Sequence, residues 1–169
     1  MNHISLKRIT GESNELEQLQ LVMESAPAYT LRITGARAQA KEAESTLSAL
    51  PPEKTIEDKF VFGIYSAQNK LIGCIDLIRG YPNEHTAFLG LLMLSEKVQA
   101  QGIGGYAYTL AEKEVKLWGT CRIVRLAGVR ANDLVLPFWK KLGFRETGEL
   151  KPYQCNLVVS ESILLEKEL

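Results

Sequence analysis

Hydrophobic residues recur at helical spacing along the amino-terminal part of this chain. Those on one face of the first predicted helix are Leu16, Leu19, Val22 and Met23. Asn14 and Glu17 have the spacing of a capping box, so we predict a helix over about residues 15–25. A short strand is predicted before this helix, at residues 4–8.

A second amphipathic pattern runs over about residues 36–50 and predicts another helix. The apolar residues on its predicted face are Ala40, Ala43, Leu47 and Leu50. Two prolines directly after the pattern end this helix, because proline cannot continue it. Residues 26–35, which contain Pro27 and Gly35, are predicted to be a connection between the two helices.

From about residue 60 the apolar period changes to two, which indicates strands. Residues 60–66 and 70–79 form a predicted antiparallel hairpin, since only a short turn separates them. Residues 86–94 are apolar on both faces, so we expect a central strand there. Gly90 within this strand suggests a bulge or a close approach by another backbone or a ligand.

Helices and strands alternate in the rest of the chain. We predict a helix over about residues 104–118, a strand over 121–129, a short helix within 130–144, a strand beginning at Phe144 and a last strand over about 161–167. A strand, a helix and a strand in this order form a parallel crossover, which is almost always right-handed. The predicted order of elements is β-α-α-β-β-β-α-β-α-β-β.

Composition and charge limit the class of protein. The chain has 169 residues, of which 46% are hydrophobic, and we expect one domain over residues 1–169. The 20 basic and 20 acidic residues give a formal net charge of zero, which offers no electrostatic basis for nucleic acid or an anionic membrane as a partner. No apolar run is long enough to span a bilayer, and the amino terminus lacks the apolar core of a signal peptide, so we expect a cytoplasmic protein.

Cysteine and histidine are too few and too scattered to predict a metal site. The cysteines are Cys74, Cys121 and Cys155, without a C-x-x-C pair. With only His3 and His85 beside them, we expect no structural zinc and no other metal. Cys155 could be a nucleophile, but no neighbouring histidine supports that role.

The stretch VQAQGIGGYA, residues 98–107, opens a predicted helix with three glycines, which is typical of a phosphate-binding loop. Gly102, Gly104 and Ala107 fit the dinucleotide pattern G-x-G-x-x-G/A. In a dinucleotide-binding fold the first glycine directly follows the first strand, whereas here seven residues separate Gly102 from Leu94. For this stretch alone, a glycine-rich turn that binds nothing is a further alternative.

Residues 88–144 closely resemble the GNAT superfamily of acyl-coenzyme A-dependent N-acetyltransferases. The first family signature is a hydrophobic strand, a short loop and Q-x-x-G-x-G at a helix start, which here are LGLLML, SEKV and QAQGIG. The second is a strand followed by Asn132, by an aromatic residue seven positions later (Trp139) and by K-x-G-F at residues 141–144. The two signatures stand in the family's order around one β-α-β unit and cover about a third of the chain.

This resemblance implies a fold, a cosubstrate and a kind of partner. The expected fold is α/β (α+β): a mixed, mostly antiparallel twisted sheet of about six to seven strands, flanked by about four helices, with a central parallel β-α-β unit. The expected activity is the transfer of an acetyl group from acetyl-coenzyme A (acetyl-CoA) to a primary amine by direct attack. The amine would belong to a small molecule or a peptide, and a homodimer is the expected assembly.

The resemblance also assigns residues that bind the cofactor. The pyrophosphate needs convergent N–H donors and a positive field, which a helix amino terminus supplies. The pantetheine amides can pair with the edge of the strand that ends at residue 94. Asn132 would bond the pantetheine arm or, alternatively, cap a helix or turn, and Trp139 would form a wall. The assigned residues are Leu92, Met93, Leu94, Gln99, Gln101, Gly102, Ile103, Gly104, Gly105, Asn132 and Trp139.

The catalytic groups depart from the family pattern, because many members carry a tyrosine at the position of Trp139. An indole N–H is not a practical proton donor at neutral pH. Either the thiolate leaves unprotonated, or Tyr153 or Cys155 protonates it. The predicted central strand has no carboxylate, so the candidate bases are Asp76, in the strand before it, and Glu84 or the adjacent histidine, in the turn that leads into it.

Acceptor selection in the family normally comes from the first two helices, their connection and the hairpin turn. The residues there that could line an acceptor pocket are Tyr29, Arg32, Arg79 and Tyr81, with an arginine pairing a carboxylate of the acceptor. The missing tyrosine keeps open a second class, a non-catalytic acyl-CoA-binding or sensing module. A dinucleotide-binding oxidoreductase is the less favoured enzyme alternative. The sequence does not name the acceptor.

Overall fold

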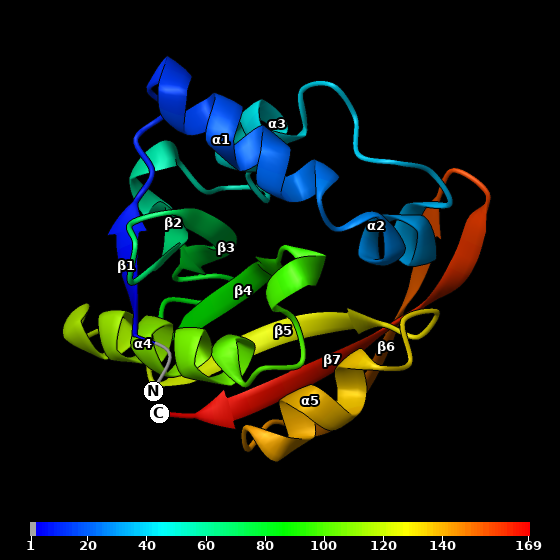
Figure 1. Ribbon diagram of the computed structural model, residues 1–169. Helices are drawn as coiled ribbons and strands as arrows, with labels where there is room; N and C mark the ends of the chain where they lie inside the picture. The colour runs from blue at the N-terminus through cyan, green and yellow to red at the C-terminus, as the bar shows by residue number, and fades with distance from the viewer. Residues whose placement is uncertain (1–2) are drawn as a thin grey trace.

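The computed structural model describes residues 3–169, and a single β-sheet lies at its centre (Figure 1). Within these residues the sheet has seven strands in the order β1-β2-β3-β4-β5-β7-β6. The strands are β1 (Ile4–Arg8), β2 (Lys59–Ser66), β3 (Leu71–Arg79), β4 (Thr86–Leu94), β5 (Ile123–Val129), β6 (Arg145–Cys155) and β7 (Val158–Glu168). Neighbouring strands are antiparallel except β4 and β5, which run parallel. The predicted mixed, mostly antiparallel sheet with one parallel unit is confirmed.

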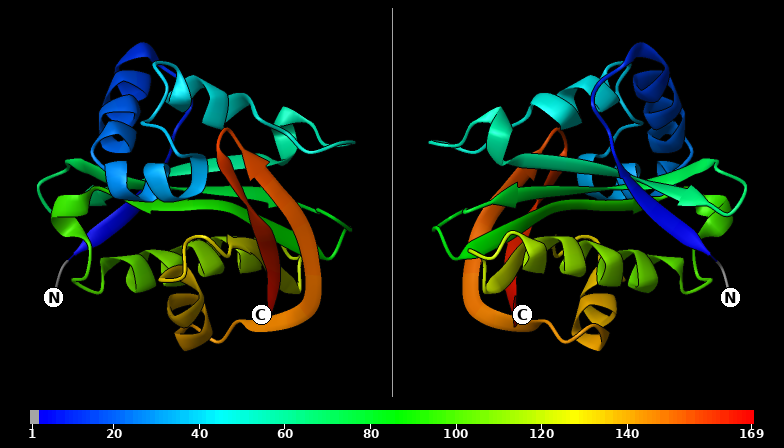
Figure 2. Two further views of the ribbon diagram at one scale, coloured as in Figure 1. Left: turned by 90° about the vertical axis from the view of Figure 1, so that its right-hand side faces the viewer. Right: turned by 90° about the vertical axis from the view of Figure 1, so that its left-hand side faces the viewer.

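Helices cover both faces of this sheet. They are α1 (Ser13–Glu24), α2 (Pro27–Thr34), α3 (Glu42–Ser48), α4 (Ile103–Leu117) and α5 (Val135–Lys141), with short 3₁₀ turns η1 (Ile56–Asp58) and η2 (Glu96–Val98). The first three helices lie on one face, whereas α4 and α5 lie on the other (Figures 1 and 2). The chain passes from β4 through α4 to β5, which is the predicted crossover. The long hairpin of β6 and β7 curves out of the plane of the other strands (Figure 2).

The prediction of a connection over residues 26–35 is wrong, because these residues form α2. Pro27 occupies its first turn, where a missing N–H costs nothing. Gly35 follows its last turn with a φ of 70°, the left-handed conformation that commonly ends a helix. Proline and glycine therefore mark the two ends of a helix here. The helix predicted over residues 36–50 is correspondingly shorter and spans Glu42–Ser48.

The first helix begins two residues earlier than predicted, and Glu12 and Glu15 form its capping box. The Glu15 carboxylate accepts the backbone N–H groups of Thr10 and Gly11 at 2.8 and 3.0 Å. The predicted pair, Asn14 and Glu17, does not cap the helix, because both residues already lie inside it. A glutamate at the third helical position plays the same part as in the predicted box, with the register moved by two residues.

The hydrophobic core forms one layer on each face of the sheet. The layer under α4 and α5 includes Ile75, Leu89, Tyr108 and Val124, each at most 4% exposed. The layer under α1 and α3 includes Leu19, Met23, Cys74 and Met93. Adjacent residues of β3 thus enter opposite layers, as the two-residue period of a strand requires. Full burial of a large apolar side chain contributes about 1.5–3 kcal/mol, so both layers hold the helices on the sheet.

β4 and β5 separate halfway along their length. Their pairing covers only the first four residues of each strand. Gly90 is an extra residue relative to β3, since Asp76 pairs with Leu91 and the following residue of β3 pairs with Leu89. This β-bulge confirms the expectation for Gly90. Beyond the bulge the two strands part, and the opening is flanked by α2 and α5.

Candidate active site

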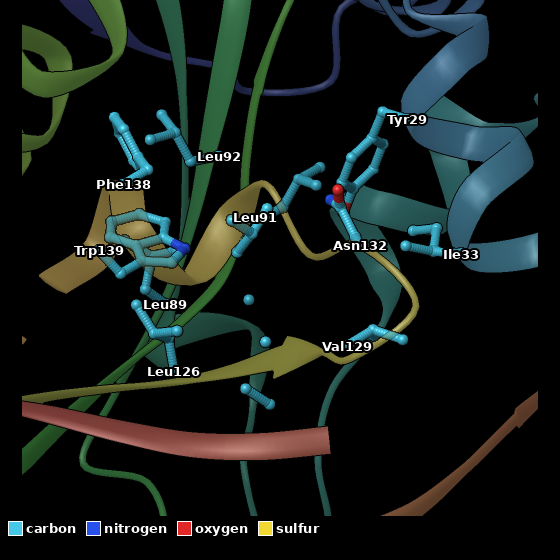
Figure 3. A pocket seen from close by; sticks show the side chains of 14 residues that line it. Tyr29, Ile33, Leu89, Leu91, Leu92, Leu126, Val129, Asn132, Phe138 and Trp139 are labelled. Carbon is cyan, nitrogen blue, oxygen red and sulfur yellow. The ribbon is translucent and has the colours of Figure 1, made fainter. Parts of the chain in front are cut away.

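The opening between β4 and β5 leads into a cleft with two connected parts. The inner pocket, about 130 Å³, lies between the separating strands, α2 and α5 (Figure 3). The outer cleft, about 690 Å³, continues past α5 to the amino terminus of α4. Residues that line both parts are Tyr29, Leu92, Asn132, Val135 and Phe138. Because the two parts share these walls, a long ligand can occupy both at once.

The glycine-rich loop forms one end of the outer cleft. Gly102 precedes α4 with a φ of 78°, a left-handed conformation that favours glycine. The first N–H groups of α4 have no partners within the helix, and a helix amino terminus attracts anions. A Cβ on Gly104 would lie 3.4 Å from the Phe138 ring, so a larger residue would narrow the cleft. The Gln99 side chain holds the loop to β4 by donating to the Leu94 carbonyl at 2.8 Å.

The charged side chains around the outer cleft are all positive. Among the described residues that line it, Arg32 on α2 and Lys141 on α5 are the only charged ones. The chain as a whole has 20 acidic residues and no net charge. A ligand with phosphate groups therefore meets two cations and no carboxylate in this cleft. Arg32, which the sequence analysis assigned to the acceptor, lines this outer cleft.

Asn132 lies where the two parts of the cleft meet and is 4% exposed. Its backbone forms the turn before α5: its N–H donates to the Val129 carbonyl at 2.9 Å, and its carbonyl accepts the Val135 N–H at 3.2 Å. The side chain caps no helix, and its Oδ1 is buried without a hydrogen-bond partner among residues 3–169. A buried amide oxygen without a donor is rare in folded proteins. It fits a ligand N–H, such as the amides of pantetheine.

Trp139 closes the inner pocket from the side of α5. The residue is 6% exposed, and its ring packs edge-on against Tyr108, Phe138 and Phe144, with centroid distances of 5.8, 4.8 and 5.2 Å. Its indole nitrogen lies on the side of the ring that faces the pocket (Figure 3). Where the family pattern has a hydroxyl, this chain presents an aromatic wall with one N–H donor.

α2 forms the opposite wall and is bonded to the segment that follows β4. The Ala28 N–H donates to the Glu96 carboxylate at 2.8 Å, and the Glu96 N–H donates to the Ser25 carbonyl at 3.1 Å. Tyr29 extends from this helix toward Asn132 (Figure 3). Burial raises the pKa of the Tyr29 hydroxyl, so the phenol stays protonated at neutral pH. The inner pocket therefore has a hydroxyl donor on one wall and an indole donor on the other.

Three residues assigned to the cofactor direct their side chains elsewhere. Met93 and Ile103 are buried in the two core layers, on opposite faces of the sheet. The Gln101 side chain donates to the Lys97 carbonyl at 3.1 Å. Only the backbone groups of these three residues can face a cofactor. Leu92, Leu94, Gln99, Gly102, Gly104 and Gly105 do line the outer cleft.

The turn between β3 and β4 lies at the end of β4 away from the bulge, about 13 Å along the strand. The Glu84 side chain is 84% exposed there. Arg79 pairs with Asp58 at 3.6 Å, and Tyr81 packs edge-on against Phe88 at 5.6 Å. None of the three predicted site residues lines either part of the cleft. An antiparallel hairpin places its turn at one end of the strand, and the bulge lies further along. The assignments of these residues as base and acceptor contacts stay predictions.

Tyr153 lies outside the cleft as well. Its hydroxyl donates to the Ile33 carbonyl at 2.6 Å, and Asn156 at the tip of the same hairpin donates to the Thr34 carbonyl at 3.1 Å. These two bonds hold the β6–β7 hairpin against the end of α2. The role of Tyr153 as proton donor to the thiolate stays a prediction, and in this structure its hydroxyl donates to a backbone carbonyl. Cys155 lines neither part of the cleft.

Asp76 lies at the bulge beside the opening and pairs with Lys59, a residue that the sequence analysis did not single out. Its Oδ2 accepts a hydrogen bond from the Lys59 ammonium of β2 at 2.9 Å. A Cβ on Gly90 would lie 3.0 Å from the same oxygen. Burial raises the pKa of Asp76 more than Lys59 lowers it. The sequence pattern did not predict a buried Lys59, because a lysine at the start of a strand is usually exposed. The signal that could have indicated this pair was Asp76, because an acidic residue within an apolar strand needs a positive charge nearby.

The three cysteines lie at separate places in the fold. Cys74 and Cys121 are buried free thiols, and Cys155 is a partly buried one. Within residues 3–169, no three side chains of histidine, cysteine, aspartate or glutamate gather as metal ligands would. None of the helices in this part of the chain combines the length and apolar character that crossing a membrane requires.

A cleft at separated strands, closed at one end by a glycine loop, defines a class of acyl-transferring protein, and comparison with known families agrees. Residues 28–144 match the acetyltransferase (GNAT) family. The match covers more than half of the 169 residues, and the chain belongs to the GNAT family of acetyltransferases. The alternative of a dinucleotide-binding oxidoreductase is wrong, because its doubly wound parallel sheet is not the one seen. Among curated proteins, none matches the sequence.

Solved structures share the fold over nearly the whole chain. An acetyltransferase from Thermus thermophilus has a TM-score of 0.73 and 19% identity, with 100% of both chains covered. A GNAT family acetyltransferase from Elizabethkingia anophelis with acetyl-CoA bound has a TM-score of 0.65 and 18% identity, over 98% of each chain. The ribosomal-protein-S18-alanine N-acetyltransferase from Escherichia coli has a TM-score of 0.70 and 13% identity, over 98% of this chain and 94% of that one. At these identities the likeness is one of fold.

Proposed function

We propose that this protein transfers the acetyl group of acetyl-CoA to a primary amine of a small molecule or peptide, by direct attack on the thioester. The observation that carries the proposal is the opening between β4 and β5, which joins a positively charged outer cleft to an inner pocket. Acetyl-CoA has the matching order of groups: phosphates at one end, an amide-bearing arm and a thioester at the other.

The residues of the outer cleft suit the phosphates and the arm. The N–H groups of residues 101–105, together with Arg32 and Lys141, would hold the pyrophosphate. Asn132 would accept an N–H of the arm through its unpartnered Oδ1. The edge of β4 over residues 92–94, which β5 leaves unpaired, would bond the arm amides as an added strand does.

The inner pocket suits the reacting groups. Acetyl-CoA supplies the activated acyl group when bound. N–H groups on the unpaired edge of β4 can donate to the thioester oxygen as it gains negative charge. Tyr29 and Trp139 can hydrogen-bond a departing thiolate while keeping their own protons. This arrangement needs no tyrosine acid at position 139.

Thermal unfolding with saturating acetyl-CoA tests the proposal, with NADH as a parallel control. At about 100 times its Kd, a ligand stabilises the folded state by about 2.7 kcal/mol, a rise of several degrees in Tm. We expect this rise with acetyl-CoA and none with NADH. A rise with NADH alone, or with neither ligand, would contradict the proposal.

One observation favours a second function, a non-catalytic acyl-CoA-binding or sensing module: the indole of Trp139 in place of a tyrosine hydroxyl. Release of free thiol from acetyl-CoA, measured with a panel of amines, separates the two. Amine-dependent release identifies the transferase. Stabilisation by acetyl-CoA without any release identifies the binding module.

A further inference from the structure

Lys59 and Asp76 form a buried ion pair that the steps above do not use. The Lys59 ammonium donates to Asp76 Oδ2 at 2.9 Å, and the two side chains are 2% and 13% exposed. Removing two charges from water carries a penalty that their attraction repays only with good geometry and further hydrogen bonds. Apolar residues of similar size often stabilise a fold as well or better. Stability alone therefore does not explain this pair.

The pair borders the inner pocket through the bulge of β4. Gly90 is exposed and lines that pocket. An added Cβ at this position would lie 3.0 Å from Asp76 Oδ2, tighter than most real Cβ contacts, so the carboxylate would have to move by a few tenths of an ångström. The absence of a side chain at Gly90 thus leaves room for the Asp76 carboxylate at the bulge. Asp76 itself lines neither part of the cleft, but it lies against Gly90, which lines the inner pocket.

The carboxylate also has an oxygen without a donor. Asp76 Oδ1 is buried and has no hydrogen-bond partner in the described part of the chain. An ionised carboxylate accepts bonds at both oxygens, and Lys59 serves only Oδ2. The unmet bond indicates a donor that arrives with a ligand, such as an amine N–H or a water molecule.

We propose that Asp76 is the base that takes the proton of the attacking amine, and that Lys59 is a positioning residue that holds the Asp76 carboxylate over Gly90. This inference rests on the proposed function. As the amine nitrogen bonds the thioester carbon, one N–H proton passes to the carboxylate, and the C–S bond breaks with its electron pair on the thiolate. The carboxylate later returns the proton to solvent.

The charges around Asp76 fit this role. Lys59 is a charged group that contacts it, and the Cys74 thiol is a titratable group that interacts with it. β4, which packs alongside, has no ionisable side chain. Burial raises the pKa of Cys74 to about 12, so the thiol stays neutral and leaves Lys59 as the one charge that favours ionised Asp76.

The test measures thiol release from acetyl-CoA over a range of pH with the full chain. The acceptors are phenylethylamine, spermidine, a peptide with a free amino terminus and, for basal hydrolysis, water. Asp76→Asn is expected to lower kcat by about 10²- to 10⁴-fold, the usual effect of losing a general base. Glu57→Gln is the matched control, an exposed carboxylate outside the cleft, and should match the wild type.

Two further variants keep the inference falsifiable where Asp76→Asn fails to fold. The double variant Lys59→Met/Asp76→Asn removes both charges and should fold yet show the same loss of turnover. Lys59→Met alone should keep turnover at high pH while the acidic limb of its pH profile moves to higher pH, because the cation that favours ionised Asp76 is gone. A merely structural lysine would leave that limb in place.

The variant Gly90→Ala tests the position of the Asp76 carboxylate. Its Cβ should displace the carboxylate and lower kcat with every acceptor, while acetyl-CoA still raises Tm as in the wild type. Turnover of the double variant within about threefold of wild type, or an unmoved pH limb in Lys59→Met, would overturn the inference. Absence of Asp76-dependent turnover with every amine and with water would also overturn it. Failure of acetyl-CoA to stabilise the wild type would instead refute the proposed function.

Discussion

At the scale of single residues, the site depends on polar atoms that the fold buries without partners. Asn132 Oδ1 and Asp76 Oδ1 both lack a hydrogen bond among the described residues. Asn132 lies where the two parts of the cleft meet, and the Asp76 carboxylate lies against Gly90 at the bulge of β4. Leaving such atoms unpaired costs free energy in the unliganded protein, and a ligand that brings donors recovers it on binding.

Asn132→Ala is expected to weaken coenzyme A binding with little change in Tm. The lost bond joins two neutral groups, so Kd should rise about two- to tenfold. Calorimetric titration with coenzyme A measures this change. Asn156→Ala is the matched control, because that amide bonds the Thr34 carbonyl outside the cleft, and its Kd should equal the wild-type value. An unchanged Kd in Asn132→Ala would contradict the proposed contact.

The Lys59–Asp76 pair leads to a second prediction, this one about stability. Asp76→Asn leaves a lysine charge buried without its partner, which should destabilise the fold by about 3–5 kcal/mol. Adding Lys59→Met removes that charge and should bring the free energy of unfolding back to within about 1 kcal/mol of wild type. Urea unfolding of both variants measures this. Equal destabilisation in the single and double variants would show that the charge is not the cause.

At the scale of elements, the position of α2 decides the shape of the cleft. Its start bonds the segment after β4, and its end receives the Tyr153 hydroxyl and the Asn156 amide from the β6–β7 hairpin. The helix therefore connects the segment after β4 to the β6–β7 hairpin, beside the opening between β4 and β5. Tyr29 and Arg32 reach the cleft only because both ends of α2 are held.

Tyr153→Phe distinguishes a structural bond from a catalytic acid. Loss of the bond to the Ile33 carbonyl should lower the free energy of unfolding by about 1 kcal/mol, since the carbonyl loses its donor. The pH profile of turnover should stay as in the wild type. Loss of the basic limb of that profile would support Tyr153 as a proton donor and contradict its placement outside the cleft.

At the scale of the whole molecule, a chain without net charge concentrates two cations in one cleft. Arg32 and Lys141 lie 109 positions apart in the sequence, on helices that cover opposite faces of the sheet. A uniform distribution of the 20 acidic residues would have placed carboxylates beside them. The arrangement favours a polyanionic ligand in this cleft.

Arg32→Ala and Lys141→Ala should each weaken coenzyme A binding about two- to fivefold at low salt, the range of a partly exposed charge interaction. Each should also reduce the dependence of Kd on ionic strength, because screening then acts on one fewer cation. Arg37→Ala, a cation that does not line the cleft, should change neither quantity. A salt dependence equal to wild type in both cleft variants would place the phosphates elsewhere.

The sequence by itself determined the order of the strands and of most helices, the bulge at Gly90 and the glycine loop before α4. These features depend on residues within a few positions of one another. A two-residue or 3.6-residue apolar period indicates a strand or a helix, and a glycine permits local backbone conformations that other residues avoid. The same reasoning failed for residues 26–35, because Pro27 and Gly35 end a helix as readily as they form a loop.

Only the tertiary structure decided which side chains meet at the site. Lys59 reaches Asp76 through the antiparallel register of β2 and β3, and Arg32 and Lys141 line one cleft because α2 and α5 flank the same opening. The same register places Glu84 and its turn at the far end of β4. Register and packing arise from contacts between residues distant in sequence, and no local period encodes them.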